Sequence, residues 1–400
     1  GLIPRLVAEG FDGIIWCTPA TRDLCAIMLE DSAHIQESDF AYDRKRAQER
    51  GRQLERRDPL YTVAEVRPAL AHFQCVDYGE ARKILPGITL TFTDAGHILG
   101  SAAVHLVADD GERVTRLTFS GDVGRYVDRL LPEPAPFPQC DVLICESTYG
   151  DRDHPAVEEA REELLRHVQR ICVQQQGRLM IPAFSIGKTQ EILYTLNALS
   201  NEGRLPRTPV FVDSPLAISA TGISRAHAQL FRPTVRAELE RDPDLFSFPG
   251  VEFVRKSEQS RQLNTRGGPC IIIAASGMMD AGRIRHHLRH GLPDERNGLL
   301  AVGFCAPGTL GDALLNGAQH VHLFGEKVPV RASISRMEFY SAHADRGELM
   351  RRVGSQDPAQ VRQVILVHGV HAALEALRGQ FTAKGFGAVH IPRLGERVEI

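Results

Sequence analysis

Four short apolar segments of the sequence each run into a histidine or an acidic residue that has glycine or serine beside it. The polar residues at these ends are His97, Asp122, Glu146 and His368. Such side chains stand where a buried strand emerges, and small neighbours let the backbone approach them closely. Imidazole and carboxylate groups together are the ligand set of zinc and similar divalent ions. The shared pattern favours one metal site at one edge of a sheet.

Each of these residues, taken alone, has a structural alternative. A histidine or an aspartate at the end of a strand is more often a turn residue than a metal ligand. His97, for example, lies in the turn-like run Ala95-Gly96-His97 and would attract no attention by itself. The metal hypothesis therefore depends on the recurrence of the pattern at four strand ends.

The elements that must position these residues change character near residue 150. Strands are predicted at 13–17, 89–93, 102–108, 116–120 and 142–145, and a charged helix at 42–60 that is either a solvated face or a nucleic-acid patch. From Asp153 helices alternate with strands: a helix with Pro155 in its first turn that runs to about Gln175, then strands at 178–181, 210–213 and 271–275 and helices at 187–200 and 218–240. This alternation predicts a doubly wound parallel sheet. A last strand, 363–367, leads into His368.

Motifs along nearly the whole chain resemble, in order, those of the β-CASP metallo-β-lactamase family, which includes RNA 3′-end-processing endonucleases and RNase J. The first part of the chain holds the segments 94–102 (DAGHILGSA), 120–122 (SGD) and 146–150 (ESTYG). The middle and last parts hold 182–185 (PAFS), 213–217 (DSPLA), 276–278 (SGM), 306–311 (APGTLG), 341–345 (SAHAD) and 367–369 (VHG). The resemblance implies an α/β fold: a metallo-β-lactamase αββα sandwich with an inserted doubly wound β-CASP domain. Its expected parts are residues 1–150 and 336–400 for the sandwich and 151–335 for the insert.

The resemblance also assigns roles to residues in the matched motifs. It implies that His97 is a ligand of one zinc ion, that Asp122 bridges two zinc ions and that His368 is a ligand of the second. Glu146 and His343 match a pair beside the metals in which the histidine donates a proton or contacts the scissile phosphate. Residues expected to bind substrate are Ser147, Ser276, Arg283 and Ser341.

The implied chemistry suits these residue types. Two metal ions about 3.5–4 Å apart share a hydroxide, polarise the phosphoryl oxygens and stabilise the leaving oxygen. Zinc lowers the pKa of bound water to about 7, which provides a hydroxide nucleophile at neutral pH. A histidine beside Glu146 can be kept oriented and protonated, ready to donate to the departing 3′ oxygen, although a purely structural ion pair is the alternative for Glu146 and His343.

The family signature HxHxDH, which supplies most of the zinc ligands, is not found in this sequence. The run that starts at Gly1 resembles the segment that directly follows the signature in family members. We therefore expect the sequence to be an incomplete part of an active enzyme. His97, Asp122 and His368 alone cannot complete two sites that each need about four donors, so the chain as given is expected to bind metal weakly and to be nearly inactive.

Composition limits the partners. With 47 basic and 50 acidic residues the net charge is −3, so RNA contacts must be local. Basic residues cluster at 283–296 and at 331–352, which include Arg283 and Arg352. We expect single-stranded RNA as partner, no membrane and, from eight scattered cysteines without a CxxC pair, a cytoplasmic location. A homodimer is left open. The alternative functions are a non-catalytic RNA-binding paralogue and a small-ester hydrolase of the same fold.

Overall fold

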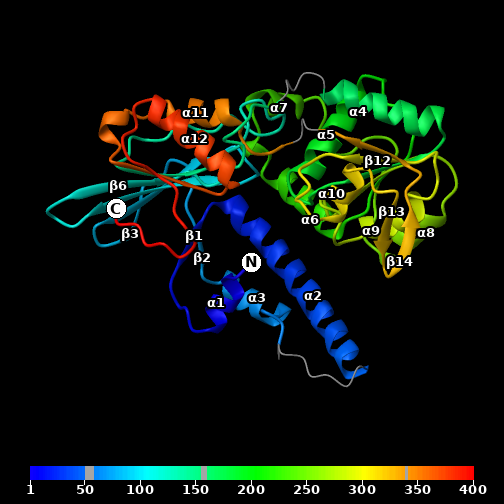
Figure 1. Cartoon of the computed structure of the whole chain (residues 1–400), viewed down its shortest axis with the longest axis horizontal. Helices are drawn as coiled ribbons and strands as arrows, with labels where there is room; N and C mark the ends of the chain where they lie inside the picture. Colours follow the sequence, from blue (N-terminus) through cyan, green and yellow to red (C-terminus); the bar gives the residue numbers. More distant parts are fainter. Residues whose placement is uncertain (50–57, 155–159, 338–340) are drawn as a thin grey trace.

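A computed structural model describes residues 1–49, 58–154, 160–337 and 341–400 of the chain (Figure 1). One lobe is built around a seven-stranded sheet with the order β17-β16-β7-β6-β5-β4-β3. Its strands are β3 (Arg82–Leu85), β4 (Ile88–Asp94), β5 (Ala102–Asp109), β6 (Val114–Phe119), β7 (Val142–Glu146), β16 (Gln363–Val367) and β17 (Val389–His390). The predicted strands at 89–93, 102–108, 116–120, 142–145 and 363–367 are confirmed.

The position of β16 shows that distant parts of the chain form this one sheet. β16 pairs in parallel with β7, and Val367 lies opposite Glu146. β7 pairs in parallel with β6 as well, whereas β3 to β6 form an antiparallel meander. The carboxyl ends of β6, β7 and β16 therefore meet at one edge of the sheet.

Two helices cover one face of this sheet (Figure 1). They are α11 (Arg346–Val353) and α12 (His371–Ala383), with a 3₁₀ turn, η5 (Pro358–Gln360), between them. Asp345 begins α11 because its carboxylate accepts a hydrogen bond from the backbone N–H of Glu348, whose own side chain bonds back to the N–H of Asp345. Leu349, Leu377 and other apolar residues of these helices pack on the sheet in one core.

The start of the chain forms a small unit below the sheet. It contains α1 (Ile3–Ala8), β1 (Ile15–Cys17), α2 (Pro19–Glu49), α3 (Val63–Leu70) and β2 (Phe73–Cys75), with β1 and β2 paired in parallel. The charged helix predicted at 42–60 coincides up to Glu49 with the end of the much longer α2, which begins at Pro19; residues 50–57 lie outside the described part, and residues 58–60 are not helical, so the predicted end is wrong. α2 reaches across to the second lobe and packs against α6 (Pro215–Ala226).

The second lobe is the predicted doubly wound sheet. Its six strands are all parallel, in the order β10-β9-β11-β8-β12-β15. They are β8 (Arg178–Pro182), β9 (Val210–Val212), β10 (Val251–Phe253), β11 (Cys270–Ala274), β12 (Gly298–Ala301) and β15 (Ser333–Arg336). Along β11, Ile271 and Ile273 belong to one core and Ile272 to another, because alternate side chains of a strand point to opposite faces. Both faces are therefore covered.

The helices of this lobe account for that covering. They are α4 (Ala160–Val168), the π-helical η2 (Gln169–Gln174), α5 (Lys188–Asn201), α6, η3 (Ala228–Leu230), α7 (Pro233–Glu238), α8 (Ser257–Thr265), α9 (Ile284–Gly291) and α10 (Leu310–Leu315). A hairpin of β13 (His320–Leu323) and β14 (Glu326–Pro329) lies at the outer end of the lobe. The predicted helix start at Pro155 lies outside the described residues. The exact domain boundaries, 150/151 and 335/336, stay a prediction.

None of the helices in the described part of the chain combines the length and the apolar character needed to cross a lipid bilayer.

Candidate active site

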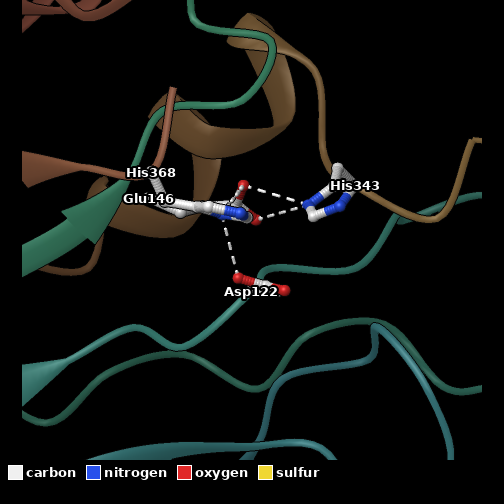
Figure 2. A group of neighbouring side chains, drawn as sticks. All are labelled: Asp122, Glu146, His343 and His368. Carbon is white, nitrogen blue, oxygen red and sulfur yellow. Dashed lines mark hydrogen bonds and ion pairs between the residues drawn. The ribbon is translucent and has the colours of Figure 1, made fainter. Parts of the chain in front are cut away.

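The polar strand ends predicted from the sequence converge at one edge of the seven-stranded sheet. Asp122 follows β6, Glu146 ends β7 and His368 follows β16, and His343 joins them from the segment before α11. One ligand atom of each of these four side chains lies within 4.8 Å of the others. Figure 2 shows the group, with Glu146 at the end of one strand, His368 just beyond the end of the adjoining strand and His343 on the other side of the Glu146 carboxylate.

Close backbone approach makes this convergence possible. Gly121 has φ +57°, and a Cβ there would lie 2.7 Å from the carbonyl oxygen of Ala102. A Cβ on Gly369 would lie 2.6 Å from the carbonyl oxygen of Ser147. These two glycines let the loops that carry Asp122 and His368 pack against neighbouring backbone, which fixes where the two ligands stand.

The carboxylate of Asp122 faces two histidines, one with each oxygen. Its Oδ1 lies 3.1 Å from Nδ1 of His368, and its Oδ2 lies 3.8 Å from Nε2 of His97. Nδ1 of His97 is 3.1 Å from the carbonyl oxygen of Ala342 and donates its proton there, which leaves a lone pair on Nε2. Burial, reinforced by the nearby His343, lowers the pKa of His97 to about 4. His97 is thus a neutral imidazole with the tautomer of a metal ligand.

Glu146 and His343 form a separate, tighter pair. Nδ1 of His343 lies 3.1 Å from Oε2 of Glu146, which also accepts a 2.6 Å hydrogen bond from the hydroxyl of Thr148. The other oxygen, Oε1, accepts the backbone N–H of Val123. Burial alone would raise the pKa of Glu146, but the hydrogen bonds from His343, Thr148 and Val123 outweigh burial and hold it below its ordinary value. Glu146 is therefore ionised near neutral pH.

The donor set fits divalent metal ions. Asp122 lies between His97 and His368 and faces an imidazole nitrogen with each of its oxygens, a combination of donors that zinc favours. Both oxygens of Glu146 are already engaged by protein donors, so Glu146 is better suited to hold His343 than to bind a metal directly. Three donors are fewer than two four-coordinate ions require.

A cleft between the two lobes opens onto this group. One cavity, of about 620 Å³, is lined by His97, His343 and three of the four predicted substrate-binding residues, Ser276, Arg283 and Ser341. A second cavity, of about 940 Å³, reaches His368 from the other side and shares Ser341 with the first. Three of the four predicted substrate-binding residues, Ser276, Arg283 and Ser341, thus lie in the same cleft as the predicted metal ligands His97 and His368.

Ser147 is placed differently. Its side chain is fully buried, and its hydroxyl has no hydrogen-bond partner among the described residues. Gly369 packs directly against its backbone, as the close approach above requires. In this structure Ser147 lies behind the site and presents no surface to a substrate.

Arg283 is held by a buried network that the sequence reasoning did not find. Nη1 of Arg283 donates to Oδ1 of Asp213 at 2.6 Å, while Oδ2 of Asp213 accepts from His287 Nε2 at 2.7 Å and from the hydroxyl of Ser260 at 2.5 Å. Burial would raise the pKa of Asp213, but these three donors together lower it. Asp213 follows the strand β9, just as Asp122 follows β6. The pattern of an acidic residue after a short apolar strand could therefore have identified Asp213 from the sequence.

The predicted basic clusters are only partly available to RNA. Arg352 is buried, with its guanidinium donating to the backbone carbonyls of Asp94 and Ala95 and lying over the ring of Phe137. His287 is also buried, and its Nε2 is hydrogen-bonded to the carboxylate of Asp213. The count of positive residues in the sequence therefore overstated the surface charge, because the fold uses two of them inside.

Comparison with known proteins adds independent information. Residues 189–314 match the model of the Beta-Casp domain, and residues 327–392 match the Zn-dependent metallo-hydrolase RNA specificity domain. The chain is 34% identical to Ribonuclease TTHA0252 of Thermus thermophilus over 400 residues, which are 100% of this chain and 85% of that protein. An RNase J-like protein of Methanocaldococcus jannaschii is 30% identical over 89% of this chain and 76% of its own length. The transcription termination factor FttA of the same organism is 32% identical over 92% of this chain, which spans only 56% of that longer relative.

Proposed function

The chain belongs to the β-CASP metallo-β-lactamase family of metal-dependent RNA nucleases, and from this premise we propose how its residues divide the work of hydrolysing an RNA phosphodiester bond. The observation that carries the proposal is the meeting of Asp122, Glu146, His343 and His368 at one sheet edge, with ligand atoms within 4.8 Å of one another. This group lies at the cleft between the two lobes.

His97, Asp122 and His368 are the proposed ligands for two zinc ions per complete site. The support is the orientation of Asp122, which turns one oxygen toward each histidine, and the tautomer of His97, whose Nε2 is free to bind metal. Divalent ions held there supply an activated water and neutralise charge on the phosphoryl group.

His343 is the proposed proton donor, and Glu146 is the residue that positions it. The ionised carboxylate of Glu146 lies 3.1 Å from Nδ1 of His343 and fixes the orientation of the imidazole ring. When water adds to phosphorus and the bond from phosphorus to the 3′ oxygen breaks, a proton from His343 passes to that oxygen. Proton transfer of this kind contributes about 10²–10⁴-fold to a rate.

Single-stranded RNA is the proposed substrate, bound by Ser276, Arg283 and Ser341 along the cleft. A cavity of about 620 Å³ lies within the range of about 300–1,000 Å³ that holds molecules of nucleotide size, whereas a duplex needs a broader surface. A homodimer of this protein stays a prediction, and a measurement of the molar mass in solution would test it.

The test uses the full-length protein and two histidine variants. We expect His343→Ala to lose about 10²–10⁴-fold in kcat for cleavage of a short oligoribonucleotide while its zinc content stays unchanged. His320→Ala, an exposed histidine of the outer hairpin, is the matched control and should retain full activity. Wild-type cleavage by His343→Ala would contradict the assigned role.

A further inference from the structure

Four large apolar side chains that are exposed to solvent gather around the 620 Å³ cavity. They are Met28 (44% exposed) and Ile35 (51%) from α2, Phe184 (41%) after β8 and Phe304 (50%) after β12. Scattered single apolar residues are normal on a protein surface, but a concave group of them marks a binding site. This group borders His97 and His343, so whatever it binds lies beside the site of hydrolysis.

The two phenylalanines come from adjoining parallel strands. β8 and β12 pair through Leu179 and Gly298, so their carboxyl ends deliver Phe184 and Phe304 to the same end of the sheet. The carboxyl ends of parallel strands are where open α/β sheets bind ligands. The ring of Phe184 lies against Gly277, where a Cβ would be 2.9 Å away, and its edge is close to Gly303. Because Gly277 and Gly303 have no side chains, the ring of Phe184 can occupy this position.

The charges of this cavity do not favour a phosphate. Lys188 in its wall is paired with Glu191 at 3.0 Å, and Arg283 is paired with Asp213 at 2.6 Å. The neighbouring 940 Å³ cavity has a more polar lining, which includes Arg152, Asp153, His154, Asp312 and Arg336; Arg152 pairs with Asp151 at 3.1 Å. One side of the cleft is therefore apolar and aromatic, and the other side is polar, with charged groups of both signs.

The two cavities meet at the catalytic edge. Thr148, Tyr149, Phe304 and Ser341 line both of them, so a single ligand can extend from one into the other. An RNA strand has this divided chemistry, with flat apolar base faces on one side and a polar sugar-phosphate backbone on the other. Exposed aromatic rings are the usual platform on which single-stranded bases stack.

We infer that the apolar cavity is a nucleobase subsite: a base adjacent to the scissile phosphate enters it and stacks on Phe304, with Phe184 as a second wall. The inference rests on the proposed function, because the metal centre must hold the phosphate for the base to reach this cavity. It assigns the aromatic residues to binding and leaves the proton transfer to His343.

The experiment is an abasic scan with the full-length protein. Oligoribonucleotides of one sequence carry a single abasic ribonucleotide at successive positions around the cleavage site, and kcat/KM is measured for each. We expect one position at which loss of the base lowers kcat/KM by about 5- to 100-fold. Phe304→Ala should lower kcat/KM by a similar factor on intact RNA and be insensitive to loss of the base at that position alone.

Matched variants separate stacking from simple bulk. Phe304→Tyr retains an aromatic face and should behave like the parent protein, whereas Phe304→Leu keeps apolar volume and should behave like Phe304→Ala. Phe324→Ala removes an equally exposed ring (43%) from the outer hairpin and should leave the whole scan unchanged.

Two results would overturn the inference. In the first result, the parent protein cleaves intact RNA, but each abasic substitution changes kcat/KM of Phe304→Ala by the same factor as it changes kcat/KM of the parent. In the other, Phe304→Ala lowers cleavage of every oligonucleotide by the same factor, which is the behaviour of a structural residue. If the parent protein cleaves no RNA at all, the proposed function fails instead, so the two failures are distinguishable.

Discussion

Glu146 illustrates how one buried carboxylate can serve a site without binding substrate. Its two oxygens accept hydrogen bonds from Val123, Thr148 and His343, and these bonds keep it ionised although it is almost fully buried. A carboxylate in that state fixes both the ring orientation and the proton of its histidine. The pair is therefore best understood as one functional unit.

Replacing Glu146 by glutamine should separate its charge from its shape. Glu146→Gln keeps an oxygen for the N–H of Val123 but removes the negative charge beside His343. We expect kcat to fall about 100-fold or more with little change in KM and no loss of zinc, measured by steady-state cleavage and metal analysis of the full-length protein. A variant that lost zinc while its kcat per bound zinc was normal would identify Glu146 as a ligand instead.

His105 gives a residue-scale prediction about stability. It is buried between the hydroxyls of Thr93 and Thr118, at 2.8 and 2.9 Å, and burial followed by the charge of Arg352 lowers its pKa from 6.5 to about 4. Between these two pH values the unfolded chain binds a proton that the folded chain does not. Its contribution to stability is therefore complete above pH 6.5 and declines as the pH falls toward 4, by about 1.4 kcal/mol per pH unit.

The variant His105→Gln keeps polar contacts to both hydroxyls and removes the titrating group. In urea unfolding between pH 6.5 and 4, its free energy of unfolding should fall less steeply than that of the parent. His320→Gln on the exposed hairpin should retain the parent's slope. Identical slopes for all three proteins would show that His105 does not titrate in this range.

At the scale of elements, the register of β16 against β7 is what brings His368 to Glu146. The loop after β16 is locked by the contact between Gly369 and the backbone of Ser147. A side chain in this position would have to displace main-chain atoms, which no rotamer change can avoid. The loop conformation is therefore part of the metal site.

Gly369→Ala tests this contact directly. The added methyl group would lie 2.6 Å from the carbonyl oxygen of Ser147, so we expect the unfolding free energy to fall by about 1–3 kcal/mol and zinc affinity and cleavage to drop together. Gly379→Ala in α12 meets no atom within 4 Å and should raise stability by about 0.5–1 kcal/mol. Calorimetry and zinc titration of both variants test this prediction. An unchanged zinc affinity of Gly369→Ala would contradict the conclusion that the loop conformation is part of the metal site.

The elements also show how far the sequence could predict this protein. The strands ending at Asp94, Phe119, Glu146 and Val367 followed from short apolar runs, and the site followed because parallel strands align their ends. The start of α2 at Pro19 was missed because exposed apolar residues such as Met28 and Ile35 lie among the buried positions Ala20, Leu24, Leu29 and Ala33 and blur the apolar stripe. The network around Asp213 was missed because Ser260 and His287 come from α8 and α9, whose packing no local pattern reveals.

At the scale of the whole molecule, the two lobes are joined by more than the chain crossovers. His227 of the insert lies 2.7 Å from Asp23 of α2, and Arg232 donates to the backbone carbonyl of Asp128 in the first lobe. The cleft likewise has walls from both lobes. The predicted site residues thus depend on the relative position of the lobes, which local sequence patterns do not encode.

Metal removal should affect the whole molecule. Asp122 and Glu146 place two carboxylates in one small group, and bound cations would offset their repulsion. We expect a chelator to abolish cleavage by the full-length protein and to lower its Tm, with both restored by zinc; a ligand at 100 times its Kd adds about 2.7 kcal/mol. Equal Tm values and equal cleavage with and without chelator would contradict a metal site here.

The place of β16 between β7 and β17 also has a consequence for biosynthesis. Asp122 and Glu146 leave the ribosome early, whereas His343 and His368 follow only after the entire parallel sheet of the insert has been translated. One core of the insert lies wholly within it, whereas the other also contains Ala20, Leu24, Leu99 and Leu130 of the first lobe, and both can form while the first sheet still lacks β16. A nascent chain therefore carries three of the five proposed site residues, His97, Asp122 and Glu146, before His343 and His368 are made, and we expect this order of translation to delay activity until β16 is in place.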